Sequence, residues 1–238
     1  MKSTRLSIAW NWTISMIRYN LKIIFANKFI WFLLASLGFF VIILLITLFS
    51  TGSISAGTIY PLLLYPGLLL IFYPTVFGIQ NDEDTRILEI LFGIPNYRYK
   101  VWLIRLVMIY LLVFVILLLL SWFCKWALVD LPVLNMAWHV MFPIFFMGSL
   151  AFLLSTFIRN GIGTGVVIIL IGVVFVAIMD LVEKTKWNIF LNPFNLPDGV
   201  SETAWKAIVH DNRVILLVGI ILAILGGLTS LQKRERFI

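Results

Sequence analysis

The feature that most constrains the fold is a long stretch without charge: residues 29–81 contain no Asp, Glu, Lys or Arg. A membrane-spanning α-helix needs about 20 consecutive apolar residues, so this stretch is long enough for two of them. The small polar run Ser50-Thr51-Gly52-Ser53 in its middle favours a turn. The sequence therefore predicts two spanning helices, at about 29–49 and 58–80.

Four more apolar runs follow, each bounded by charged residues, and predict spans at about 103–124, 137–157, 161–181 and 213–231. Apolar side chains make up 62% of the chain and charged ones only 12%, against about a quarter in soluble domains. We therefore expect an all-α, polytopic membrane fold with a single six-helix transmembrane domain over 29–232. A loop at about 182–212, forming a lid or re-entrant cap, and a basic tail over 233–238 complete it.

The distribution of basic residues predicts the orientation. If the amino terminus is cytoplasmic, thirteen of the 18 Lys and Arg residues lie on the cytoplasmic side. The five on the other side are Lys125, Lys184, Lys186, Lys206 and Arg213. This asymmetry predicts that both termini are cytoplasmic and that the loop at 182–212 faces outward.

Residues 1–28 contain a different kind of helix, predicted over 8–25. Its apolar residues recur at spacings of four and three, and its polar residues follow the same rhythm one step along. The residues that define its two faces are Trp10, Ile14, Ile17, Arg18, Leu21 and Lys22. Such a helix lies in the membrane interface. It serves either as a simple anchor or as a lever docked on a cytoplasmic partner.

The cytoplasmic connection between the second and third predicted spans is rich in acidic residues. Asp84 or Thr85 can cap a short helix at about 83–95, and Pro95 would end it. Apolar residues recur along one face of this segment. One interpretation is an ordinary capped loop helix; the other is a helix that fits a groove on a partner protein.

This connection resembles the coupling helix of type-2 ABC transporter permeases, in which a segment reading roughly Glu-x-Gly-Thr-Leu-Glu-x-Leu-x-x-x-Pro rests on the nucleotide-binding subunit. The matching residues here are Asp84, Thr85, Leu88, Glu89, Leu91 and Pro95. Asp84 stands where the family has glycine, and two residues separate Thr85 from Leu88. The interfacial helix, the six spans, the outward loop before the sixth span and the basic tail are also similar to that family.

The resemblance implies a permease subunit in a bacterial cytoplasmic membrane. It would pair with a second permease copy or paralogue and with separate ABC ATPase subunits that carry the ATP and Mg. Its cargo would be a hydrophobic or amphipathic substrate such as a lipid, drug or peptide, moved by export. The chain itself has no Gly-rich phosphate-binding loop with lysine, so we expect no ATP hydrolysis, cofactor or metal site on it. Its basic residues lie between apolar runs, which does not favour nucleic acid binding.

The second predicted span contains tyrosine–proline pairs. The candidate substrate-path residues are Tyr60, Tyr65, Pro66, Tyr73 and Pro74. Proline bends a spanning helix, because it breaks the hydrogen-bond ladder. The span is either a kinked, tightly packed helix or a wall of the translocation path. The resemblance places the second and fifth spans beside the substrate cavity.

The fifth span contains Gly161, Gly165 and Gly172, and its Gly-x-x-x-Gly spacing permits close helix contact within a subunit or between subunits. Two other functions stay open. Ser149, within the fourth span, would be the nucleophile of an intramembrane serine protease, although His139 and His210 fall near the outer boundaries. The second alternative is a non-transporting membrane anchor for an ATPase.

Overall fold

The computed structural model describes residues 29–49, 54–84, 98–158 and 160–234, and the side chains of 98–100 and 232–234 are left aside. Within these ranges the regular structure is helical. The elements are α2 (Phe29–Phe49), α3 (Ala56–Val76), α4 (Gly78–Asp84), the π-helix η1 (Arg98–Leu103), α6 (Ile104–Ala127), α7 (Val133–Ile158), α8 (Gly161–Ala177) and α9 (Glu202–Arg234).

Among the described residues, five helical segments are long and apolar enough to cross a membrane: Phe29–Phe49, Ala56–Asp84, Val101–Ala127, Val133–Ile158 and Glu202–Leu231. The remaining predicted span, the fifth one at about 161–181, corresponds to α8, an apolar helix of 17 residues. At about 1.5 Å per residue, α8 is roughly 26 Å long, slightly less than the hydrocarbon thickness of about 30 Å. The described fold is thus an all-helical bundle with the composition of a multi-pass membrane protein.

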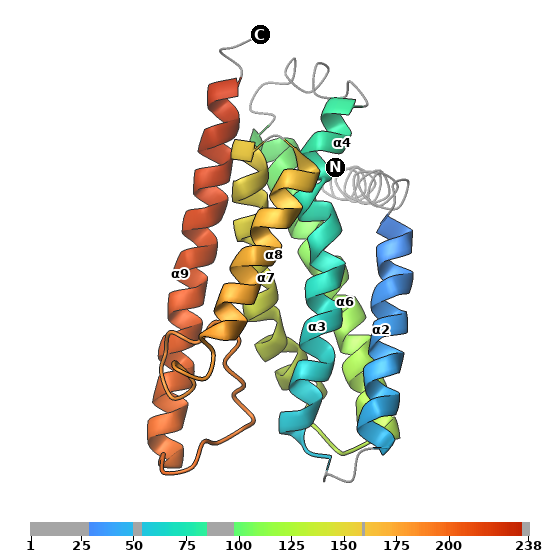
Figure 1. Cartoon of the computed structure of the whole chain (residues 1–238), viewed down its shortest axis with the longest axis vertical. Coiled ribbons are helices and arrows are strands. Elements are labelled where there is room, and N and C mark those ends of the chain that lie inside the picture. Colours follow the sequence, from blue (N-terminus) through green and yellow to red (C-terminus); the bar gives the residue numbers. More distant parts are fainter. Residues whose placement is uncertain (1–28, 50–53, 85–97, 159, 235–238) are drawn as a thin grey trace, which may run out of the picture.

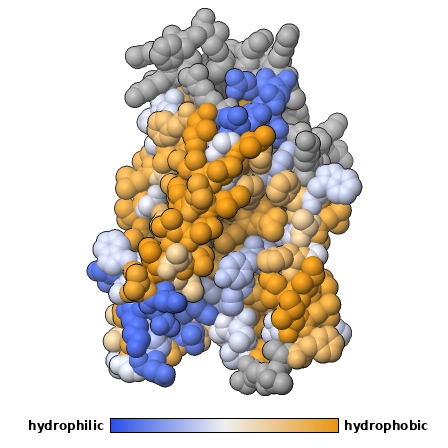
Figure 2. Space-filling model, viewed as in Figure 1, coloured by the Kyte–Doolittle hydropathy of each residue, from blue (hydrophilic) through white to orange (hydrophobic). Residues whose placement is uncertain are grey.

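The helices run alternately up and down, so that the start of α2 and the end of α9 lie at the same end of the bundle (Figure 1). The central helix is α7, which packs against α3, α6, α8 and α9, while α2 packs mainly against α3. Residues such as Leu63 on α3 and Val140 on α7 are fully buried. Apolar surface covers the middle of the molecule, and hydrophilic residues gather toward its ends (Figure 2).

The largest correction to the sequence prediction concerns the start of the last helix. Residues 202–212 were expected in the outward loop, but they form the first turns of α9. The Oγ of Ser201 accepts a hydrogen bond from the N–H of Ala204 at 3.3 Å, and Lys206 pairs with Glu202 one turn earlier. The charges in this segment exclude it from the hydrocarbon, but they do not exclude a helix that continues beyond the membrane.

Other boundaries shift by a few residues. The helix predicted over 137–157 begins at Val133, and the one predicted over 161–181 ends at Ala177. The predicted interfacial helix over 8–25 lies outside the described residues, as does most of the predicted coupling helix, including Thr85, Leu88, Glu89, Leu91 and Pro95. Of that segment, Asp84 is described as the last residue of α4. Both helices therefore stay predictions.

Candidate functional site: a chamber between α3, α7 and α8

An apolar chamber of about 350 Å³ lies between α3, α7 and α8. Its lining residues are Tyr65, Leu68, Ile71, Phe72, Thr75, Met147, Ala151, Ile168, Ile169, Gly172, Val173, Val176 and Phe190. The hydroxyl of Thr75 donates to the carbonyl of Ile71 on its own helix, 2.7 Å away, so it presents no free donor to the chamber. Such walls suit a hydrocarbon group.

The chamber has a side that faces the membrane. Ile169 and Val173 on α8 line it and are also more than half exposed on the outer surface of the bundle. A lipid-soluble molecule therefore needs to pass only the α8 side chains to reach the chamber from the bilayer. This position distinguishes the chamber from a closed packing defect inside the core.

A second, more polar cavity of about 210 Å³ adjoins the chamber, sharing Tyr65 and Phe190 as lining residues. Its remaining lining residues are Tyr60, Pro61, Leu64, Met179, Asp180, Glu183, Asn188, Asn192, Asn195, Pro197 and Trp205. Asp180 and Glu183 are exposed, and neither forms an ion pair with another described residue. The two cavities together offer an apolar compartment with a polar, acidic mouth.

The loop 178–201 walls the polar cavity and is fastened to two helices. The Nδ2 of Asn192 donates to the carbonyl of Gly57 on α3 at 2.8 Å. The Nδ2 of Asn212 on α9 donates to the carbonyl of Asn188 at 2.8 Å. The loop thus links α3 to α9, and movement of either helix would change the shape of the mouth.

The five tyrosines and prolines predicted to line a path separate into two groups. Tyr60 and Tyr65 line the polar cavity, and Tyr65 also lines the chamber. The carbonyl of Pro66 instead accepts a hydrogen bond from the Oγ of Ser36 on α2 at 2.8 Å. Pro74 is half-buried and lines neither cavity. The first group faces the cavities, while Pro66 contacts α2.

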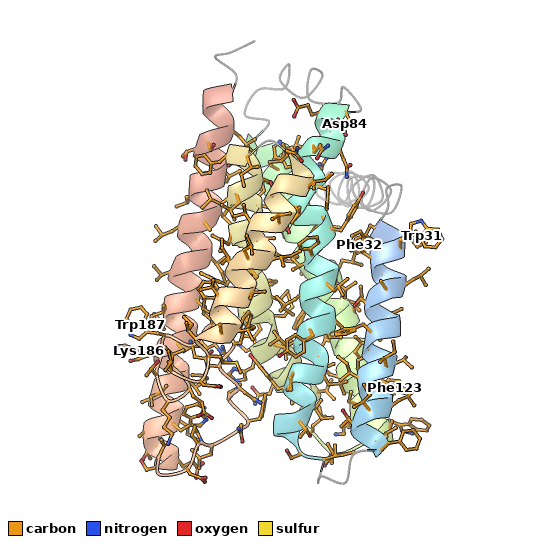
Figure 3. All side chains as sticks on the ribbon, viewed as in Figure 1. Trp31, Phe32, Asp84, Phe123, Lys186 and Trp187 are labelled. Atoms are coloured by element: carbon orange, nitrogen blue, oxygen red, sulfur yellow. The ribbon has the colours of Figure 1, made fainter. Side chains whose placement is uncertain are left out.

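Tyr73 also belongs to the packing side of α3. Its ring stacks on that of Phe32, with centroids 4.8 Å apart, and its hydroxyl accepts a hydrogen bond from Asn81 at 3.1 Å. Figure 3 shows Phe32 directed from α2 toward α3 and the neighbouring Trp31 directed away from the bundle. Tyr73 thus connects α2 with the end of the α3–α4 segment.

The glycines of α8 have different surroundings. A Cβ on Gly161 would overlap the ring of Phe77, and its N–H donates to the side-chain oxygen of Gln80. A Cβ on Gly165 would lie 3.3 Å from Cζ of Phe72. Gly161 and Gly165 therefore face α3 and the turn after it in the same chain, whereas Gly172 lines the chamber.

An ion pair connects the two sides of the predicted coupling segment. Arg105 on α6 donates from Nη1 to Oδ2 of Asp82 on α4 at 2.7 Å, and both side chains are more than nine-tenths buried. The guanidinium also lies over the ring of Trp102, 4.8 Å from its centroid. Removing one partner of such a pair is far more costly than breaking an exposed pair, because the other charge stays buried.

Ser149, the candidate nucleophile of the alternative function, is fully buried. Its Oγ shares a hydrogen bond with the hydroxyl of Tyr110 at 2.7 Å. His139 lies on the same helix, ten residues earlier, which corresponds to about 15 Å along the axis. In the part of the chain that the structure describes, no three His, Cys, Asp or Glu side chains come together as a metal site.

Several residues of the cavities were not identified as site residues from the sequence. In the sequence, Asp180 stands at the end of an apolar run, which is typical of a span boundary, and Asn192 precedes Pro193, which is typical of a turn. Phe190 and Met147 carried no signal, because an aromatic or methionine side chain in an apolar run is typical of packing. The acidic residues Asp180 and Glu183, which follow an apolar run, were the one signal in the sequence for the polar cavity.

No protein-family model, curated protein or solved structure matches this chain. The class that the described fold defines is an all-helical, multi-pass membrane protein with an apolar cavity between α3, α7 and α8.

Proposed function

We propose that this chain is the permease subunit of an ABC exporter and forms the translocation path for a hydrophobic or amphipathic substrate. The observation that carries the proposal is the apolar chamber of about 350 Å³ between α3, α7 and α8, adjoined by a polar cavity at one end of the bundle. A lipid, drug or peptide with an apolar portion fits this pairing, since its apolar part can occupy the chamber and its polar part the mouth.

The ion pair of Asp82 and Arg105 could transmit movement of the predicted coupling segment to the helices of the bundle. It fastens α4 to α6 on either side of residues 85–97, the segment whose sequence resembles a coupling helix. A push on that segment would act on α4, which continues α3 beyond Phe77, and α3 forms one wall of both cavities. Binding of ATP by the partner subunit would shift the equilibrium between two cavity shapes only if the ATP-bound partner binds one of these shapes better than the other.

The proposed assembly contains two permease subunits, identical or paralogous, and two ABC ATPase subunits carrying ATP and Mg. The up-and-down order of the helices, with α8 counted, is consistent with both termini on one side. The excess of basic residues favours the cytoplasm for that side, and the resemblance to type-2 ABC permeases supports a bacterial cytoplasmic membrane. The loop 178–201 and the acidic mouth would then face outward.

Copurification with an ATPase subunit tests the proposed coupling. We expect Glu89→Ala and Leu91→Ala to weaken association with the ATPase and to reduce its transport-linked activity. Glu183→Ala is the matched control, because it also removes an acidic side chain but at the opposite end of the bundle. It should leave association with the ATPase unchanged. If the Glu89 and Leu91 variants associate and hydrolyse ATP like the unmodified chain, the assignment of this segment is wrong.

A further inference from the structure

A cleft of about 440 Å³ lies between α7 and α9, near the start of both helices and separate from the chamber. Its lining residues are Trp138, His139, Phe142, Lys206, Val209, His210, Arg213, Val214 and Leu217. No residue is shared with the lining of the chamber or of the polar cavity. The cleft therefore needs an explanation of its own.

The central charged group of the cleft is Arg213, whose side chain is buried although it carries a full positive charge. Its Nε donates to His139 at 3.3 Å, and its Nη2 donates to the carbonyl of Leu191 at 3.1 Å. Its Nη1 donates to the side-chain oxygen of Asn212 at 2.9 Å. The guanidinium also interacts with the hydroxyl of Tyr60 and lies over the ring of Phe142, 5.4 Å from its centroid.

None of these partners of Arg213 carries a negative charge. The four ion pairs among the described residues do not include Arg213. A buried charge is costly unless an opposite charge accompanies it. The cleft thus contains a cation whose counter-charge is not supplied by the described part of the chain, and an anion bound there would supply it.

The rest of the cleft indicates which kind of anion. Arg213 stands directly before the apolar stretch of α9, a position typical of basic side chains that contact lipid phosphates at the end of a spanning helix. Val214 and Leu217 continue the cleft on the hydrocarbon side, and each is about half exposed. Trp138, which is also exposed, suits the interfacial position. A cation at phosphate height above an apolar groove matches a lipid rather than a free anion.

Lys206 adds a second cation at the mouth of the cleft, and its Nζ lies 2.7 Å from Oε1 of Glu202. Both side chains are about three-quarters exposed. Exposed pairs of this kind are weak, so Lys206 can exchange its partner for a phosphate. Glu202, in contrast, competes with that phosphate for Lys206.

We propose that this cleft binds an anionic phospholipid from the leaflet at that end of the bundle, with the headgroup phosphate at Arg213 and Lys206 and an acyl chain along Val214 and Leu217. The proposal does not depend on the transport function. It assigns a structural or regulatory lipid to a site outside the cavities.

The test is native mass spectrometry of the full-length purified chain with phosphatidylglycerol, phosphatidylcholine or inorganic phosphate, together with thermal unfolding in the same mixtures. We expect preferential retention of phosphatidylglycerol and a higher unfolding temperature with it. Lys206→Gln should weaken that binding about fivefold, the effect of one basic residue near an anionic lipid. Glu202→Gln should strengthen it, because it frees Lys206.

Lys125→Gln is the matched control, because Lys125 is also exposed, is also paired with an acid, Asp130, and lies at the same end of the bundle outside the cleft. It should not change lipid binding. Equal retention of the two lipids would overturn the proposal, and so would equal effects of Lys125→Gln and Lys206→Gln. Full competition by inorganic phosphate would assign the cleft to a free anion instead. Because the substitutions at Lys206 and Glu202 are on the surface, the test does not depend on folding of an Arg213 variant.

Discussion

Arg105 and Asp82 form a buried ion pair with 2.7 Å between Nη1 and Oδ2, joining α6 to α4 across residues 85–97. The pair fixes the separation of the two helices that enter and leave the predicted coupling segment. Asp82 also has a further interaction within the chain. Of the four ion pairs among the described residues, the pair of Arg105 and Asp82 is the one whose side chains are both buried.

We expect Asp82→Asn to lower the free energy of unfolding by about 3–5 kcal/mol, because the charge of Arg105 stays buried without its partner. Replacing both residues, as Asp82→Leu with Arg105→Met, should cost less than the sum of the single changes. Denaturant unfolding in detergent measures the free energy of unfolding of the single and double variants. The exposed pair of Lys125 and Asp130 is the control: Asp130→Asn should change stability by about 0.5 kcal/mol or less. An equally small effect of Asp82→Asn would contradict the stabilising role of the buried ion pair between Asp82 and Arg105.

Gly161→Ala should destabilise the protein by about 1–3 kcal/mol, because the added Cβ overlaps Phe77 and forces α8 away from α3. Gly38→Ala is the control, since a Cβ there meets nothing within 4 Å. In that exposed helix position alanine should be neutral or should stabilise by up to about 1 kcal/mol. Thermal unfolding of the two variants, measured side by side, checks the difference. Equal behaviour would mean that α8 does not pack closely on α3.

Gly172→Leu should fill the apolar chamber while leaving the fold intact, because a Cβ on Gly172 would meet Met147 only at an ordinary contact distance of 3.6 Å. Binding of an apolar fluorescent probe to the purified chain should weaken roughly tenfold, as expected when a side chain occupies part of an apolar pocket. Gly38→Leu adds the same side chain on a lipid-facing helix and should leave probe binding unchanged. Unaltered binding to the Gly172 variant would place the probe elsewhere.

Ser149→Ala separates the transport proposal from the protease alternative. It should cost about 1–3 kcal/mol of stability, because the buried hydroxyl of Tyr110 loses its 2.7 Å hydrogen bond and keeps only the longer one, 3.5 Å, to the carbonyl of Phe145. Adding Tyr110→Phe should recover part of that loss. Peptide cleavage by the purified chain without any ATPase, abolished by Ser149→Ala, would instead support the enzyme.

The sequence predicted the helical class and the approximate positions of the helices, because charge-free runs are a direct consequence of the cost of placing charge in hydrocarbon. The start of α9 at Glu202 was missed for the same reason. Charge marks where the hydrocarbon ends and says little about where a helix begins. Ser201 and the pair of Glu202 with Lys206 were the local signals for that start.

The cavities could not be predicted, because helices such as α3 and α8 are apolar on every side and show no direction toward a core. Tyr65 and Tyr73 have similar surroundings in the sequence, yet Tyr65 lines the chamber and Tyr73 stacks on Phe32. Only the packing of α3 between α2 and α8 separates the two. The link of Asp82 to Arg105 was likewise hidden, since each was used to mark the boundary of an apolar run.

ATP-dependent flux is the most direct test of the central claim that the chain is a permease driven by a separate ATPase. The full chain and its copurifying ATPase would be reconstituted in vesicles with a hydrophobic fluorescent cation, chosen for the acidic mouth at Asp180 and Glu183. We expect movement of the dye across the membrane that requires ATP and Mg, is lost with Gly172→Leu and persists with Gly38→Leu. ATP hydrolysis by the complex without movement of any hydrophobic or amphipathic cargo tried would contradict the claim and favour a membrane anchor.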